Sequence, residues 1–131
     1  PKNTVLERVR VFRESLRDNA QAGAPQQIAL ARALYIAKDE ADKMEAIERR
    51  MNARAKVDAL SQRPDGQNKS SIMTHKGSEE ALDGALIGTI DEIVQRLFEL
   101  RSGGVDYILL VDAGGGINGL RQFAKDVVPQ L

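Results

Sequence analysis

Hydrophobic residues recur at helical spacing between Thr89 and about Ser102, and the flanking residues define where this helix begins and ends. Thr89 is a suitable N-cap, and Glu92 three residues later completes a capping box. Gly103 and Gly104 provide the left-handed position at which a helix ends. The apolar face of this predicted helix consists of Ile90, Ile93, Val94, Leu97 and Phe98.

A strand and a second helix follow. Residues 105–111 are apolar except for Asp106, so both faces of the strand are hydrophobic, which is typical of a parallel sheet covered by helices. The chain leaves this strand through a glycine-rich loop, residues 112–116. The last helix is predicted to face the core with Ile117, Leu120, Ala124, Val127, Val128 and Leu131. This half of the chain is therefore an α-β-α piece of an α/β protein.

The N-terminal half repeats this plan less distinctly. Helical spacing from Val5 to about Asn19 predicts a first helix, with a possible capping box at Thr4 and Glu7. Residues 27–37 predict a buried strand with two alternating faces. One face carries Ile28, Leu30, Arg32, Leu34 and Ile36, and the other carries Ala29, Ala31, Ala33, Tyr35 and Ala37.

A weakly apolar helix is predicted from Asp39 to about Leu60. Its charged residues offer i,i+4 pairs, Asp39 with Lys43 and Glu45 with Arg49, so we expect it to face solvent. Residues 62–78 then show no period and gather Pro, Gly, Asn and Ser. Loops of this length in compact domains are lids, binding loops or disordered segments, and we expect this one to be cut first by proteases.

Only two strands are visible in the sequence, yet each is apolar on both faces. Parallel sheets need neighbours on both edges and cover on both faces. The chain also starts at Pro1 and enters a helix almost at once. We therefore expect further strands upstream in a longer chain, and we expect these 131 residues alone to form homo-oligomers, swap elements or associate with the rest of their protein.

Composition narrows the classes of function. Lys plus Arg and Asp plus Glu both number 19, so net charge gives no reason to expect nucleic acid as a partner. The absence of cysteine and the single histidine argue against a metal site. The longest apolar runs are strand-sized, which argues against a membrane span, and no secretory signal is visible. A cytoplasmic protein is expected.

Candidate ligand-binding residues fall in three places. Gly114, Gly115 and Gly116 precede a helix, where backbone N–H groups can bind phosphate, although we favour the simpler interpretation of a tight strand-to-helix turn. Arg32 lies mid-strand and could approach an anionic ligand, although pairing with a carboxylate of a neighbouring strand is favoured. Ser70, Ser71, His75 and Lys76, with Lys69, are polar residues of the long loop. They could act on substrate as lid residues or could simply be solvated.

Three segments carry a resemblance to a known family: 27–43, 70–89 and, most specifically, 86–131. The chain resembles the C-terminal part of luciferase-like flavin-dependent monooxygenases, whose fold is a (β/α)8 barrel. That family opens its last helix–strand unit with Gly-Thr-Pro-Asp-Glu, whereas here Ile90 stands in place of the proline. The family closes with a Gly-Val-Asp strand, a glycine-bearing loop and an Arg-Phe-Ala helix that ends in Val-x-Pro.

The resemblance implies that residues 27–37 and 105–111 are the seventh and eighth barrel strands and that 39–80 is an insertion contributing a mobile lid. It implies reduced flavin mononucleotide (FMN) as cofactor, with electrons from NAD(P)H, and a deazaflavin as the alternative. It also implies O2 and a small organic molecule as substrates and a flavin reductase as a possible partner. The main flavin contacts and the catalytic residues are expected upstream of this chain.

The principal alternative is a non-catalytic α/β fragment that acts in oligomerisation or partner binding. A helical adaptor built on residues 39–61 is not supported, because that helix lacks a sustained heptad.

Overall fold

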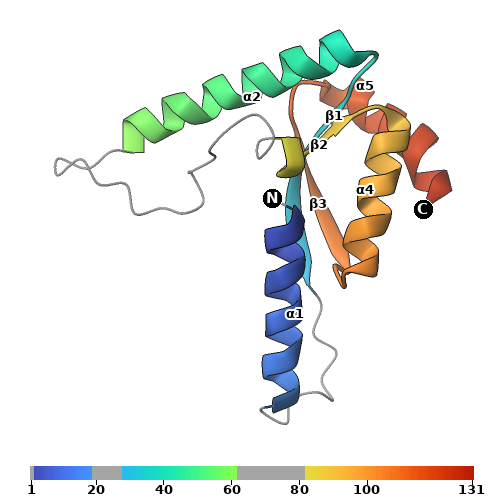
Figure 1. The fold of residues 1–131 in the computed structure, drawn as a ribbon. Helices are drawn as coiled ribbons and strands as arrows, with labels where there is room; N and C mark the ends of the chain where they lie inside the picture. Colours follow the sequence, from blue (N-terminus) through green and yellow to red (C-terminus); the bar gives the residue numbers. More distant parts are fainter. Residues whose placement is uncertain (1, 19–27, 62–81) are drawn as a thin grey trace.

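The computed structural model describes residues 2–18, 28–61 and 82–131 as an α/β unit with a small parallel sheet (Figure 1). Its elements are α1 (Lys2–Asp18), β1 (Ala29–Ile36), α2 (Glu40–Ser61), β2 (Leu86–Gly88), α4 (Ile90–Ser102), β3 (Tyr107–Asp112), α5 (Gly116–Gln122), a π-helical turn η1 (Phe123–Val127) and a 3-10 turn η2 (Val128–Gln130). The last three form one continuous C-terminal helix. The predicted order of helices and strands is confirmed, apart from one additional strand.

The additional strand is β2, and the prediction of two strands within the described residues is wrong. The sheet has the order β2-β1-β3, with all strands parallel. β3 pairs with β1 from Ala29↔Tyr107 to Leu34↔Asp112. β2 pairs with the opposite edge of β1, at Leu34↔Leu86 through Ile36↔Gly88. A strand of three residues is too short to show alternation, and its only sequence signal is the apolar run before Thr89.

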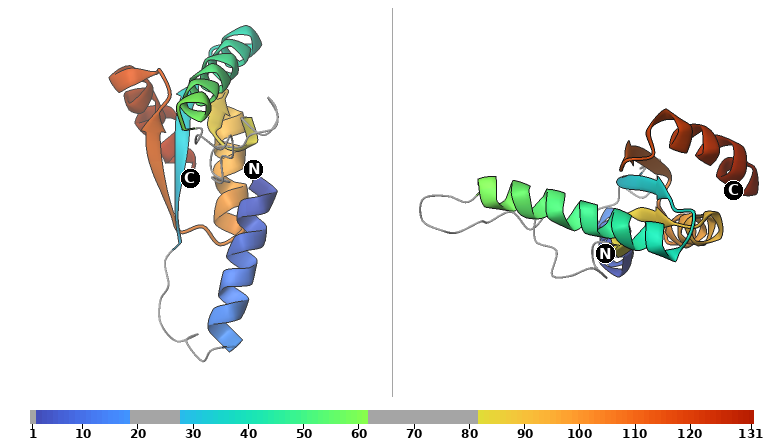
Figure 2. Two further views of the ribbon diagram at one scale, coloured as in Figure 1. Left: turned by 90° about the vertical axis from the view of Figure 1, so that its left-hand side faces the viewer. Right: turned by 90° about the horizontal axis from the view of Figure 1, so that it is seen from above.

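Helices cover one face of this sheet. Leu34, Leu86 and Leu110 pack against Ile93 and Leu97 of α4, together with Phe123 and Val127 of the C-terminal helix. Lower on the same face, Leu30 packs in a second cluster with Val9 of α1. Seen from above, α4 and the C-terminal helix lie on the same side of the strands (Figure 2). The even-numbered face of β1 therefore packs against helices, with Leu34 buried and Leu30, Arg32 and Ile36 partly buried. The predicted burial of both faces of this strand is wrong for Ala29 and Ala31, which are exposed.

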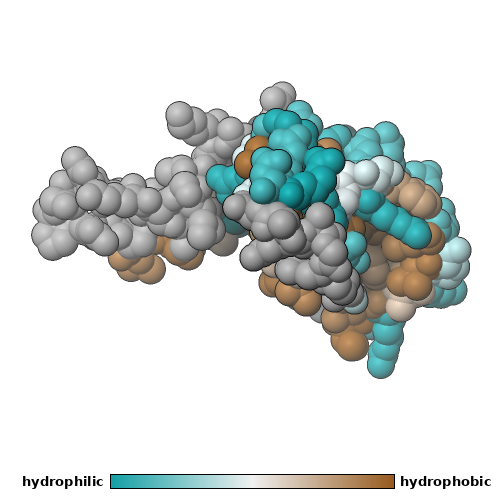
Figure 3. Space-filling model, turned by 90° about the horizontal axis from the view of Figure 1, so that it is seen from below, coloured by the Kyte–Doolittle hydropathy of each residue, from teal (hydrophilic) through white to brown (hydrophobic). Residues whose placement is uncertain are grey.

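The opposite face is covered only near the carboxyl ends of the strands. There Ala33 and Ile87 pack against Ala46 and Ile47 of α2, which runs across the strand ends in Figure 1. On this face, the apolar side chains of β3 remain open to solvent along the whole strand: Tyr107 is 51%, Leu109 61% and Val111 55% exposed. Seen from below, the molecule has hydrophobic residues gathered on its surface (Figure 3). The prediction that β3 is buried on both faces is therefore wrong for the described residues.

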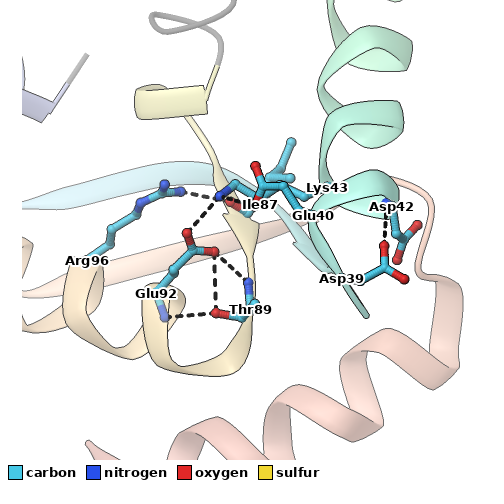
Figure 4. Close-up of polar contacts among 8 residues, drawn as sticks. All are labelled: Asp39, Glu40, Asp42, Lys43, Ile87, Thr89, Glu92 and Arg96. Atoms are coloured by element: carbon cyan, nitrogen blue, oxygen red, sulfur yellow. Dashed lines mark hydrogen bonds and ion pairs between the residues drawn. The ribbon is translucent and has the colours of Figure 1, made fainter.

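The predicted limits of α4 are confirmed. Thr89 accepts a hydrogen bond from the Glu92 N–H, and the Glu92 side chain accepts one from the Thr89 N–H, which completes the capping box (Figure 4). Gly104, with φ of 93°, provides the left-handed residue after the helix. Ile93 and Leu97 are buried, whereas Phe98 is 42% exposed, so the predicted apolar face extends one residue too far.

Two predictions about the other helices are wrong. α1 begins at Lys2, so Thr4 lies inside the helix and cannot cap it. In the C-terminal helix only Val127 is buried, and Ile117 is 62% exposed. The physical reason is that β3 is the last strand of the sheet among the described residues, so nothing described packs against the Ile117 side of that helix.

A buried lysine joins α2 to α4 (Figure 4). Lys43 Nζ lies 2.7 Å from Glu92 Oε1 and 3.1 Å from Glu40 Oε2, and the residue is 8% exposed. The predicted pair of Lys43 with Asp39 is replaced, because Asp39 accepts a hydrogen bond from the Asp42 N–H at the start of α2. The second predicted pair of α2, Glu45 with Arg49, is confirmed at 2.7 Å.

Candidate anion-binding pocket at the carboxyl ends of the strands

A pocket of about 520 Å³ lies between α2 and the odd-numbered face of β1, where β1 and β3 end. The sheet side contributes Ala33, Val111 and the loop that follows β3. The helix side contributes Arg49, Arg50, Arg54 and Val57. Residues 50, 54 and 57 lie at i, i+4 and i+7, which places them on one side of α2. The pocket thus has an apolar floor and a wall rich in arginine.

The arginines differ in how they are held. Arg49, at the exposed edge, pairs with Glu45 at 2.7 Å, and its guanidinium lies 5.3 Å from the centre of the Tyr35 ring. The Tyr35 hydroxyl donates to Asp42 at 2.8 Å, which fixes the ring under Arg49. These contacts anchor Arg49 by a carboxylate and an aromatic face.

Arg50 is half-buried, and its hydrogen bonds are incomplete. One amino group donates to the Gly84 carbonyl at 3.4 Å, and Nε is buried with no hydrogen-bond partner in the described part of the chain. Burial lowers the pKa of Arg50, and the charges of Arg54 and Arg32 lower it further. The site therefore holds a cation that is desolvated and repelled by its neighbours.

Asp112 is the acidic residue among the described residues that line this pocket, and it accepts hydrogen bonds within its own loop. Oδ1 accepts hydrogen bonds from the N–H of Gly116 at 2.8 Å and of Gly114 at 3.3 Å. Gly114 (φ 114°) and Gly116 (φ 58°) adopt left-handed conformations that favour glycine. The turn closed by Asp112 accounts for the glycines and engages two of the N–H groups that phosphate binding by the loop would need.

Arg32 lies elsewhere, on the helix-covered face. It lines a small cavity with Asp83, Leu86 and Arg96. One amino group donates to the Ala31 carbonyl at 3.1 Å, and the other is buried without a hydrogen-bond partner among the described residues. Burial lowers the Arg32 pKa, and the charge of Asp83 opposes that shift. No ion pair of Arg32 forms within the described residues, so its expected carboxylate partner is not seen there.

The structure thus brings Gly114 to the arginines of α2. Arg32 does not line this pocket, although it lies near enough for its charge to lower the pKa of Arg50. The loop candidates Ser70, Ser71, His75 and Lys76 lie outside the described residues. Sequence reasoning missed the three arginines of α2. Their signal was faint: basic residues at 49, 50 and 54 on a helix otherwise rich in paired charges.

Comparisons of the chain with protein-family models, with curated proteins and with solved structures find no match. In the described segments, no three histidine, cysteine, aspartate or glutamate side chains gather as a metal ion would need. Likewise, no described helix combines the length and apolar character required to cross a membrane. The pocket geometry therefore carries the functional argument, together with the resemblance noted in the sequence.

Proposed function

We propose that this chain is the C-terminal part of a (β/α)8 barrel and belongs to a luciferase-like flavin-dependent monooxygenase. One observation carries the proposal: a cationic pocket opens at the carboxyl ends of parallel strands, on the face opposite α1, α4 and the C-terminal helix. Active sites of such barrels lie at this end of the strands. The inner wall of a barrel is also opposite its outer helices, and α2 covers the corresponding face here only near the strand ends.

The pairing of the strands is compatible with this proposal. β1 and β3 are parallel neighbours, as consecutive barrel strands must be. The exposed side chains Tyr107, Leu109 and Val111 would face the barrel interior, where side chains of the other strands bury them. β2 occupies only the last three positions of the free edge of β1, so residues 29–33 keep an edge at which a preceding strand could pair.

Reduced FMN is the proposed cofactor, with electrons from NAD(P)H delivered through a flavin reductase, and a deazaflavin is the alternative. When bound, the reduced flavin supplies two electrons, so that one atom of O2 enters a small organic substrate and the other leaves as water. The described residues contribute the apolar floor of the site and a positive charge near its mouth. Their task is to position ligand groups and exclude water. We place the protein in the cytoplasm.

Isotope labelling tests the proposed reaction. The complete natural protein, reduced FMN and a panel of small organic compounds are incubated under ¹⁸O2, and products are analysed by mass spectrometry. We expect one labelled oxygen atom in the product of at least one compound. Labelled peroxide alone, with every compound recovered unchanged, would contradict the monooxygenase assignment.

A non-catalytic role in oligomerisation or partner binding is the second candidate. The exposed apolar face of β3 favours it, because such a face is suited to association with another chain. In that case the arginines of α2 would be surface charges, and the complete protein would bind no flavin.

A further inference from the structure

We propose that the pocket between α2 and the ends of β1 and β3 is a binding site for a phosphate group, held by the guanidinium groups of Arg50 and Arg54 with Arg49 at its edge. The site is argued from its own contacts. Only the identification of FMN as one source of the phosphate rests on the proposed function.

Arg50 has a hydrogen-bond donor without a partner among the described residues. A buried guanidinium is costly unless acceptors satisfy its N–H groups. Arg50 Nε is buried without an acceptor in the described part of the chain, and the contact of Arg50 with the Gly84 carbonyl is long at 3.4 Å. An oxyanion in the pocket would supply the missing acceptors.

The charges that line the pocket favour an anion. Among the described residues, three arginines and one acidic residue, Asp112, line it, and one Asp112 oxygen accepts hydrogen bonds from two loop N–H groups. The Arg54 charge works against the protonated form of Arg50 and lowers its pKa. A dianion between the two side chains would turn this repulsion into attraction.

The spacing of Arg50 and Arg54 along α2 suits a shared ligand. Arg50 and Arg54 are separated by one helical turn, so their side chains leave α2 on the same side. A guanidinium offers parallel N–H donors that match two oxygens of a phosphate. Arg49 is held in place by Glu45 and the Tyr35 ring, so it adds charge at the edge at a smaller entropic cost. Because the N–H groups of Gly114 and Gly116 already donate to Asp112, the arginines are the better ligands.

Two sources share this chemistry: the phosphate of FMN and a phosphate-bearing substrate. Titration calorimetry of the complete natural protein with inorganic phosphate tests the site itself. We expect Arg50→Gln to weaken phosphate binding by about tenfold or more, and Arg50→Gln with Arg54→Gln to abolish it. Lys56→Gln, which removes an exposed charge from the same helix outside the pocket, should bind as the wild type does.

Riboflavin and FMN distinguish the sources. If FMN binds more tightly than riboflavin and this preference disappears in the Arg50→Gln, Arg54→Gln variant, the phosphate is that of the flavin. If the variant keeps the preference but loses inorganic phosphate, the site serves a substrate. Phosphate binding without flavin binding would support the site and contradict the monooxygenase proposal.

Equal phosphate affinity of wild type and double variant, or no phosphate binding by the wild type, would overturn the inference. If the double variant fails to fold, a measurement on the wild-type protein tests the site. Its melting temperature should rise saturably at low millimolar phosphate and constant ionic strength, where the general stabilising effect of phosphate salts is small. The absence of such a rise would overturn the site.

Discussion

Replacement of Ile93 by alanine is expected to lower the free energy of unfolding by about 3 kcal/mol, because the cavity lies where α4, the sheet and the C-terminal helix meet. Ile93 is 0% exposed and packs in one cluster with Leu34, Leu86 and Val127. These residues come from distant parts of the chain, so few neighbours can move together to fill the space. The measurement is denaturant unfolding followed by circular dichroism.

Phe98 provides the matched control for this variant. It belongs to the same helix and to the same predicted apolar face, but it is 42% exposed. Phe98→Ala should therefore lower the free energy of unfolding by less than about 1.5 kcal/mol, despite the larger loss of side-chain volume. Equal losses for the two variants would show that the two α4 positions do not differ in burial as described.

Replacement of Lys43 by methionine is expected to lower the free energy of unfolding by about 2 kcal/mol at neutral pH. The lysine is buried with Glu92 at 2.7 Å, and methionine fills similar space without the charge. Glu92 would keep its bond from the Thr89 N–H, at 2.8 Å, but lose its ion pair. An exposed pair offers the control: Arg10→Met, on α1, should have a much smaller effect.

This interaction also predicts a pH dependence. The hydrogen bond from Lys43, and then that from the Thr89 N–H, lower the pKa of Glu92 below its ordinary value of 4.5. A depressed carboxylate pKa stabilises the fold above the unfolded-state value, and this contribution is lost as pH falls through the folded value. The difference between wild type and Lys43→Met should thus be constant near neutral pH and shrink below about pH 4.5. A difference that does not change in acid would contradict the assigned pair.

Local signals in the sequence predicted the ends of α4 well, whereas the equally local capping box at Thr4 and Glu7 was wrong. The capping box of Thr89 and Glu92 and the left-handed Gly104 depend on residues close in sequence, and both are present. β2 escaped prediction because three residues carry no period and their partner is β1, fifty residues earlier. The exposure of Ile117 was equally inaccessible, since it depends on where the sheet ends.

In the pocket, too, contacts between neighbours in sequence could be predicted, and contacts between distant segments could not. The turn at Gly114 could be interpreted from the sequence alone, because Asp112 and the glycines are neighbours. The arginines of α2 could not be connected with it. The arginines lie beside the loop after β3 only because α2 crosses the ends of the strands. This arrangement is fixed by the packing of Ala46 and Ile47 on Ala33 and Ile87.

The central claim is tested most directly by anaerobic titration of the complete natural protein with reduced FMN. Binding is followed by flavin absorbance and by calorimetry. The account predicts saturable binding of one reduced flavin per barrel, with weaker binding in the Arg50→Gln, Arg54→Gln variant if FMN supplies the phosphate of the α2 pocket. Absence of saturable binding of reduced FMN and of a reduced deazaflavin would contradict the assignment to flavin-dependent monooxygenases.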